Sequence, residues 1–428
     1  MPHISIHTFA LYLALLFSAL VGAVIGLSQF AGMDYLAGAL VPLSLVAVLA
    51  WALYAVLRHL AQRDDENPLV SGLGPEGIML QRATASALGR AIDSEAGRHF
   101  AAGEVHFQGG DYEAAAVAYR NSVDSEESLA ADLNLAAALL SIADFQGARE
   151  ALTMGYTQAQ RQRSREYEAA FLLNMGALHA RQGKLVDALG AYREAQRHHE
   201  LLGGGRGLGD ALVNTGQAQA HLGRGEAALE SGERALAVYE ETGSEPGRAA
   251  ALGCMGYAHS CRDEFPEALE YFQQALAIHK ELGNALGQGH VLTHMGNVRF
   301  KEEDYEGALE AYARASTLHG AVRDALGEAS AMVNMGNVHF RQGELDAAQE
   351  NYDEAFRIHE RAGNVMGQAR ALTNIGSLLA RQRRVESALD TLQRARGFYL
   401  EVGDDSRGLQ SVEKLIARLE AEVGGTES

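Results

Sequence analysis

Two hydrophobic patterns divide the chain. Residues 9–30 and 36–57 are almost wholly apolar and carry no charge. From about residue 93 onward, apolar residues instead recur at intervals of three and four, which is typical of helices that bury one face. Residues 165–202 contain two such runs on either side of Gly183, which interrupts the pattern. Each such stretch therefore predicts a pair of packed helices.

The helical pattern repeats every forty residues. One position is always glycine and two others are always alanine: Gly176, Gly216, Gly256, Gly296, Gly336 and Gly376, then Ala188, Ala228, Ala268, Ala308, Ala348 and Ala388, then Ala195, Ala235, Ala275, Ala315, Ala355 and Ala395. A sustained period of this length indicates a solenoid, in which each unit buries its apolar face against its neighbours. A glycine also follows most second helices, where a left-handed residue ends a helix easily, and position 323 departs from this with Arg323.

The repeat resembles the tetratricopeptide repeat (TPR). In that family a small residue in the first helix is followed by Gly or Ala twelve positions later, an aromatic residue four further on and Ala three beyond, as in Gly176, Ala188, Tyr192 and Ala195. The resemblance implies an all-α, right-handed solenoid of about eight helix pairs between residues 93 and 403. Residues 407–422 are expected to form a capping helix, so that the solenoid domain spans 93–428.

The forty-residue spacing, and an Asn two positions before the glycine, are most similar to the Partner-of-Inscuteable/LGN branch of this superfamily. That resemblance implies a scaffold that holds extended peptides. No C-terminal GoLoco-like motif is present, so the branch's role with G proteins does not transfer.

The apolar N-terminal runs predict a transmembrane hairpin over residues 1–60, because each is long enough to cross a bilayer as a helix. Arg58 and Arg63 follow the second run at once, which favours a two-span membrane protein with its C-terminal domain in the cytoplasm. A secretory signal peptide is the alternative. Residues 61–92 contain acidic residues, then Pro68, Gly72 and Pro75, and are expected to form a flexible linker.

The inner wall of such a solenoid is lined by the first helix of each repeat. Two positions before the small residue, this wall carries Asn134, Asn174, Asn214, Cys254, His294, Asn334 and Asn374. An amide side chain can both donate to and accept from the backbone of an extended peptide, so these asparagines are predicted to bind one. Asn297 and Asn337 extend the same polar wall. The alternative is that the amides fix the stacking of repeats.

Cations occupy a second register, five positions after the small residue. Arg181, Lys301, Arg341 and Arg381 lie there, and Arg370 is one turn from Asn374. In a protein with 36 basic and 55 acidic residues and a net charge of -19, this arrangement favours an acidic or phosphorylated partner segment and disfavours nucleic acid. The same positions end helices, where a cation also complements the helix dipole.

No motif for catalysis or for a cofactor is found. The chain has no glycine-rich phosphate loop after a strand and no nucleophile elbow, and its carboxylates are scattered. His290 and His294 are four residues apart and could supply two zinc ligands beside Cys254, but no second pair with ligand spacing accompanies them. Polar groove residues explain these positions more simply, so we expect no metal.

Together these patterns predict a membrane-anchored scaffold, without enzymatic activity, that binds a protein or peptide in its concave groove. A peptide- or ligand-responsive regulator and a self-assembling scaffold, with a possible homo-oligomer, are the alternatives.

Overall fold

The computed structural model describes residues 69–73, 78–84, 94–401 and 407–426. The chain divides into two compact units, Met1–Pro68 and Leu69–Ser428, and all described residues lie in the second.

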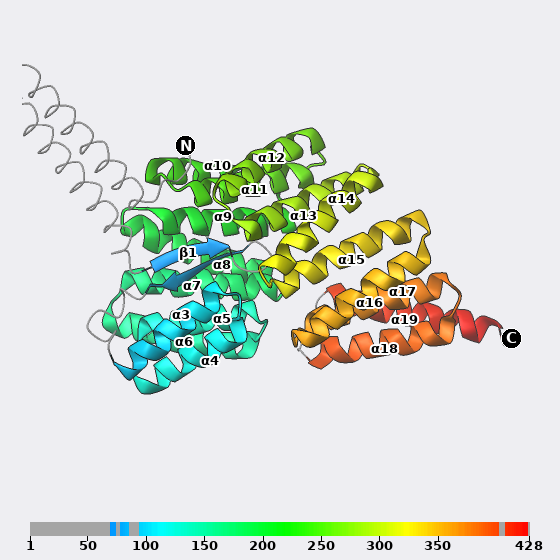
Figure 1. Ribbon diagram of the computed structural model, residues 1–428, viewed down its shortest axis with the longest axis horizontal. Helices are drawn as coiled ribbons and strands as arrows, with labels where there is room; N and C mark the ends of the chain where they lie inside the picture. Colours follow the sequence, from blue (N-terminus) through cyan, green and yellow to red (C-terminus); the bar gives the residue numbers. More distant parts are fainter. Residues whose placement is uncertain (1–68, 74–77, 85–93, 402–406, 427–428) are drawn as a thin grey trace, which may run out of the picture. The chain divides into compact units, whose positions relative to one another are not determined.

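Seventeen helices make up most of the described chain, as Figure 1 shows. They are α3 (Glu95–Gln108), α4 (Tyr112–Ser125), α5 (Leu129–Ser141), α6 (Phe145–Gln162), α7 (Arg165–Arg181), α8 (Leu185–Leu201), α9 (Arg206–His221), α10 (Gly225–Thr242), α11 (Glu245–Cys261), α12 (Phe265–Glu281), α13 (Ala285–Lys301), α14 (Tyr305–Ala321), α15 (Ala325–Gln342), α16 (Leu345–Arg361), α17 (Val365–Arg381), α18 (Val385–Glu401) and α19 (Arg407–Thr426). The first sixteen form consecutive pairs, and α19 packs on the last pair. The predicted all-α solenoid is confirmed.

Small residues at the repeat positions allow the helices of a pair to approach closely. A Cβ added at Gly176 would lie 2.3 Å from the ring of Tyr192, and one at Gly336 would lie 2.5 Å from the ring of Tyr352. Ala188 and Ala195 are fully buried in the same repeat. The forty-residue register therefore reflects a packing requirement repeated along the solenoid.

Histidines in the second helices pack in a similar way against the next repeat. An added Cβ would lie 2.2 Å from the His199 ring at Gly207, 2.4 Å from the His279 ring at Gly287 and 2.3 Å from the His359 ring at Gly367. The turns between repeats end in left-handed residues, and Arg323 adopts that conformation with a φ of 56° although it is not glycine.

The solenoid curves enough to bring distant repeats together. A Cβ added at Gly110, between α3 and α4, would lie 2.8 Å from the carbonyl oxygen of Val322, between α14 and α15. Successive odd-numbered helices from α5 to α17 also contact one another, so these first helices form the inner wall of a partly enclosed groove.

A β-hairpin lies in this groove. Strands β1 (Leu69–Leu73) and β2 (Met79–Ala83) pair antiparallel, with Leu69 opposite Ala83 and Leu73 opposite Met79. Strand β2 contacts α5, α7 and α9, and Figure 1 shows the hairpin along these helices. Both strands fall within residues 61–92, for which the sequence suggested a flexible linker without regular structure.

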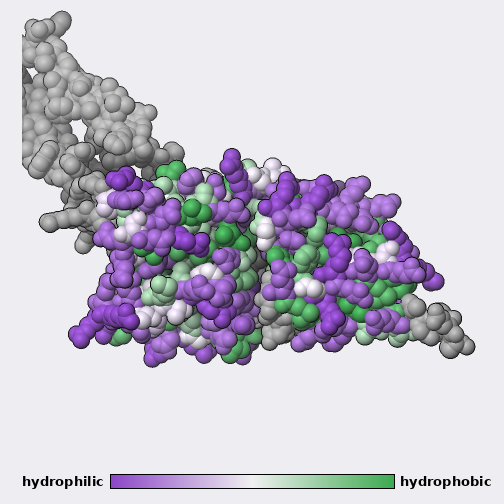
Figure 2. Space-filling model, turned by 90° about the horizontal axis from the view of Figure 1, so that it is seen from below, coloured by the Kyte–Doolittle hydropathy of each residue, from purple (hydrophilic) through white to green (hydrophobic). Residues whose placement is uncertain are grey.

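The predicted membrane localisation is wrong. Among the helices of the described ranges, none is both long enough and apolar enough to cross a membrane. Their apolar residues lie in seams between helices, and hydrophilic residues cover most of the face seen in Figure 2. The two predicted spans, residues 9–30 and 36–57, lie outside the described residues.

Candidate peptide-binding groove

Three asparagines hold strand β2 through its backbone. The side-chain oxygens of Asn214, Asn174 and Asn134 accept from the N–H groups of residues 79, 81 and 83 at 2.9, 2.9 and 2.6 Å. Their Nδ2 atoms donate to the carbonyl oxygens of the same residues at 2.9, 2.8 and 3.0 Å. Each asparagine thus forms a two-bond clamp on one residue of an extended chain.

The clamps fit a strand because they recur at every second residue. In a β-strand the backbone groups of alternate residues point to opposite edges. Residues 79, 81 and 83 therefore face the asparagines, and residues 80 and 82 face β1 through the observed pairing. One forty-residue repeat of the solenoid corresponds to two residues of the bound strand.

The side chains of β2 are also enclosed. Met79, Leu80 and Ala83 are buried. Gln81 Nε2 donates to Asp210 Oδ2 at 3.4 Å. The Arg82 guanidinium pairs with Glu104 at 3.1 Å and stacks 4.1 Å from the centre of the Phe107 ring.

Glu104 connects the strand to the end of the groove. Its Oε1 atom accepts from Tyr119 Oη at 2.5 Å and from Asn134 Nδ2 at 2.9 Å, in addition to Arg82. Burial and the Glu104 charge raise the pKa of Tyr119, so its hydroxyl remains a donor. This carboxylate stands in the register that Asn297 and Asn337 occupy in later repeats.

The asparagine series is interrupted after Asn214. Cys254 is buried, its thiol donates to the carbonyl oxygen of Val213 at 3.7 Å, and burial raises its pKa to about 12. His294 stacks on Phe272 with ring centres 5.6 Å apart, and burial lowers its pKa to about 4. Neither residue can reproduce the two-bond amide clamp. We call the part of the groove at Asn134, Asn174 and Asn214 the closed section, and the part from Cys254 to Asn374 the open section.

The asparagines of the open section differ in their contacts. Asn297 accepts from Tyr312 Oη and Asn337 accepts from Tyr352 Oη, both at 2.8 Å. The Asn334 Nδ2 atom is 3.4 Å from Asn297 Oδ1. Asn374 is half-buried and has no hydrogen-bond partner within the described ranges. Asn297 and Asn337 thus each join the two helices of their own repeat through a hydrogen bond to a tyrosine.

Three predicted cations bond to helix ends. Arg181 donates to the carbonyl oxygen of Leu140, Lys301 to that of Ser260 at 2.8 Å and Arg381 to that of Phe340 at 2.9 Å. Each carbonyl lies in the last turn of the preceding odd-numbered helix, where it also accepts a backbone N–H from the turn that follows, at residue 143, 263 or 343. Arg341 lies in the last turn of α15 and is exposed, and Arg370 on α17 is exposed without an ion-pair partner among the described residues.

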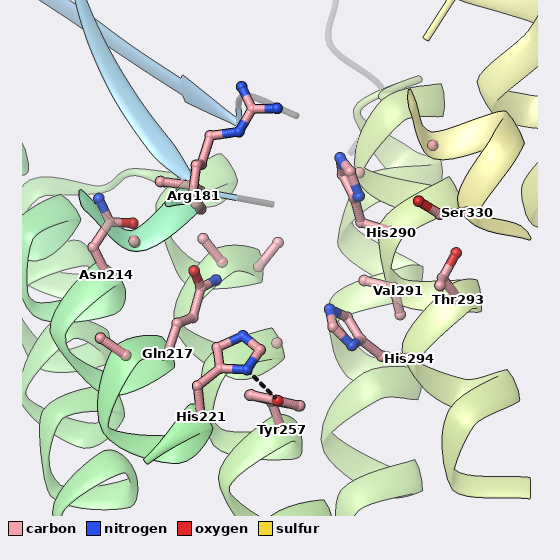
Figure 3. A pocket seen from close by; sticks show the side chains of 18 of the residues that line it. Arg181, Asn214, Gln217, His221, Tyr257, His290, Val291, Thr293, His294 and Ser330 are labelled. Carbon is pink, nitrogen blue, oxygen red and sulfur yellow. Dashed lines mark hydrogen bonds between the residues drawn. The ribbon is translucent and has the colours of Figure 1, made fainter. Parts of the chain in front are cut away.

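Cavities of about 440, 210 and 400 Å³ lie along the open section, and the largest also reaches Ile78 and Asn214 at the edge of the closed section. Figure 3 shows the largest, between Asn214, Gln217 and His221 on one side and His290, Thr293 and His294 on the other. None of the residues that line the three cavities is Asp or Glu, although the chain has 55 acidic residues. Arg181, Lys301 and Arg370 are among them, so the open section is suited to a negatively charged segment.

His290, which lines the largest cavity, is held neutral because it is buried. Burial lowers the pKa of His290 to about 3, and its ring lies 5.0 Å from that of His319. The part of the chain that the structure describes contains no group of three His, Cys, Asp or Glu side chains placed to hold a metal ion, and His290, His294 and Cys254 do not form one.

Two charged residues that contact β2, Asp210 and Glu104, are not among the site residues predicted from the sequence. Both lie on inner-wall helices, Asp210 one turn before Asn214 and Glu104 directly after Gly103. The forty-residue register could have located these positions. It could not have shown a charged role, because other repeats carry different residues there.

Comparisons with known proteins agree with this architecture. A tetratricopeptide repeat family model matches residues 167–241, 247–319 and 327–401, and a second model of the same description matches 293–358. A search of curated proteins finds no match.

Among solved structures, a Rap protein complexed with competence and sporulation factor has a TM-score of 0.51 and 13% identity, covering 78% of this chain and 99% of that one. Aspartyl phosphate phosphatase F from Bacillus subtilis has a TM-score of 0.44 and 13% identity, covering 77% and 94%. A putative kinesin light chain from Podosopora anserina has 0.38 and 13%, covering 45% and 95%.

These matches do not support the narrower resemblance to the Partner-of-Inscuteable/LGN branch, and at this identity the structural likeness establishes the fold alone. The three segments matched by the first family model together make up more than half of the sequence. The chain belongs to the tetratricopeptide repeat family.

Proposed function

We propose that this protein is a scaffold that binds an extended segment of a partner protein in its concave groove. One observation carries the proposal: three asparagines at the predicted register each exchange two hydrogen bonds with an extended backbone. In this case the bound backbone is the chain's own strand. The proposed role is binding alone: side chains held in place on the inner wall form hydrogen bonds to the partner, and no chemical step is involved.

The open section supplies the partner site. Asn334 and Asn374 continue the register of the three clamps, and Arg370 lines two of the cavities. Because the lining has cations and no carboxylate, we propose that the partner segment is acidic there. The other predicted groove cations, Arg181, Lys301, Arg341 and Arg381, contribute positive potential, although the first two and Arg381 also hold helix ends.

A peptide library tests this function. Extended peptides alternating Glu with apolar residues should bind the full chain, and peptides with Lys in place of Glu should not. The variant Asn334→Ala/Asn374→Ala/Arg370→Ala should bind the acidic peptides about tenfold more weakly and with a smaller dependence on salt, because it loses a charged contact and two amides. Fluorescence polarisation measures both quantities.

The control is Arg314→Ala, which removes an exposed cation on α14 that pairs with Glu310 and lines none of the three cavities. It should leave the affinity unchanged. Equal binding by the triple variant and the unaltered chain would reject the open section as the partner site.

A further inference from the structure

The three clamps in the closed section recognise backbone and not side chains. Six hydrogen bonds join Asn134, Asn174 and Asn214 to N–H and C=O groups of β2, and the remaining bond of Asn134 goes to Glu104 and not to a side chain of the strand. Any segment that enters in the same direction as an extended chain can make the same bonds. The side chains of β2 therefore decide how strongly the closed section binds it compared with another extended segment.

Gln81 is an imperfect side chain for its site. It is 3% exposed, and its Nε2 atom reaches the carboxylate of Asp210 only at 3.4 Å. Its Oε1 atom is buried and has no hydrogen-bond partner. Asp210 is 1% exposed, and its other oxygen accepts from Tyr239 Oη at 2.7 Å. The site thus presents a buried carboxylate oxygen to a side chain that offers it a long bond and leaves its own acceptor unsatisfied.

We infer that residues 78–83 are an internal competitor, and that the closed section accepts in trans an extended partner segment carrying Lys or Arg where this chain has Gln81. The inference rests on the proposed function, since it requires that the groove bind polypeptide. A lysine or arginine side chain has only donors, so it brings no acceptor that could be left unpaired. It also places a positive charge beside the Asp210 carboxylate, which gives a stronger hydrogen bond than a neutral amide.

The neighbouring positions define the rest of the partner segment. The residue in the place of Ala83 must be small, because Ala83 is fully buried within the core around Phe100 and Tyr119. The residue in the place of Met79 must be apolar, because Met79 packs in a cluster with Leu212 and Val213. A second basic residue fits the place of Arg82, which pairs with Glu104.

A partner bound in the same direction as β2 would continue from the closed section into the open section. Strand β2 runs from Asn214, at Met79, to Asn134, at Ala83. A partner extended toward its own N-terminus from the place of Met79 would pass Cys254 and His294 and enter the cavities that lack carboxylates. The preferred partner therefore has an acidic stretch followed by two apolar residues, in the places of Met79 and Leu80, then two basic residues and a small one.

Two labelled peptides test the competition, IMLQRA, which copies residues 78–83, and IMLKRA. The variant Gln81→Pro removes the N–H group that Asn174 accepts from, and should release β2 from the groove. Gln81→Ala is the matched control, because it also deletes the side-chain amide but retains the N–H. Fluorescence polarisation gives the affinities, and hydrogen exchange of residues 78–84 reports whether β2 has left.

IMLKRA should bind the Gln81→Pro chain at least about tenfold more tightly than the unaltered chain or the Gln81→Ala chain, since β2 must leave these two before the peptide can enter. It should also bind about tenfold more tightly than IMLQRA, and adding Asn174→Ala should abolish binding. In the unaltered chain, excess IMLKRA should speed the exchange of residues 78–84, which decides the matter even if Gln81→Pro does not fold.

Three results would overturn the inference: no binding of IMLKRA to the folded Gln81→Pro chain, equal affinity for that chain and the unaltered one, or exchange unchanged by the peptide. None of these results would contradict the proposed function, because that function is tested separately with acidic peptides and the Asn334/Asn374/Arg370 variant. If only the acidic peptides bind, β2 is a permanent part of the fold.

Discussion

The closed and open sections of the groove carry the same residue in the same register, but they use it differently. Asn134, Asn174 and Asn214 are almost completely buried, and each holds a residue of β2 by two hydrogen bonds. Asn334 and Asn374 are half-buried, and no strand of the described chain covers them. A repeat thus fixes where an amide lies in the groove, while its role depends on what lies opposite.

The position directly after the small residue of the first helix gives a second comparison. Glu104 accepts from Tyr119 and also pairs with Arg82 of the bound strand. Asn297 and Asn337 accept from the equivalent tyrosines, Tyr312 and Tyr352, without contact to a strand. The closed section thus has a negative group where the open section has neutral ones, which matches the basic residue at position 82.

The largest expected difference between the sections is in stability. Asn174→Ala should lower the free energy of unfolding by about 2 to 6 kcal/mol, because it leaves the buried N–H and C=O of Gln81 without partners. Asn374→Ala should lower it by less than about 1 kcal/mol, since Asn374 is half-buried and makes no comparable bonds. Urea denaturation of both variants measures the difference, and similar losses would contradict the distinction between the two sections.

The stability of the protein should depend on pH through His290, which lines the cavity next to Asn214. Burial lowers the pKa of His290 to about 3 from 6.5, so between these values the unfolded chain binds a proton that the folded chain does not. Stability should therefore fall as the pH decreases from 6.5, and at pH 4 this residue should account for a loss of about 3 kcal/mol.

The comparison variant for this effect is His290→Gln, which cannot titrate. Its stability should depend less on pH over that interval, with thermal or urea unfolding as the measurement. Asp132 acts in the opposite sense, because burial raises its pKa to about 6 and its contribution is lost as the pH rises through that value. Both chains contain Asp132, so the difference between them isolates His290; parallel pH profiles would exclude the effect.

The smallest difference concerns the tyrosine contacts. Tyr119→Phe removes a donor to the charged Glu104 and should lower stability by about 1.5 to 3 kcal/mol. Tyr352→Phe removes a donor to the neutral Asn337 and should lower it by about 0.5 to 1.5 kcal/mol. The two variants delete the same atom at equivalent positions, so a larger loss for Tyr352→Phe would show that the Glu104 network is not charged as described.

The sequence predicted the solenoid well because its packing is local and periodic. The close approach of Gly176 to Tyr192, and of Gly336 to Tyr352, needs the same residue types in every repeat, and so it is visible as a forty-residue register. The inner-wall position of the asparagines follows from that register as well. The register also placed Arg181, Lys301 and Arg381 at the ends of their own helices, but it did not predict that they donate to carbonyl oxygens of the preceding odd-numbered helix.

The hairpin could not be predicted in this way. Its strands are five residues long, occur once and lie among Pro and Gly residues, so they produce no periodic pattern. The contacts that hold β2 join residues 51, 93 and 135 positions apart. Nothing in the local sequence of Gln81 indicates that its backbone faces Asn174.

By itself the sequence determined the repeat, the helix pairs and the line of amides along the inner wall, because each of these depends on neighbours within one or two repeats. The tertiary structure alone decided that three of these amides hold the chain's own strand, and that carboxylates face this strand while none lines the open cavities. Those outcomes depend on the curvature of many stacked repeats and on the matching of a two-residue strand spacing to the spacing of the helices, which no single segment encodes.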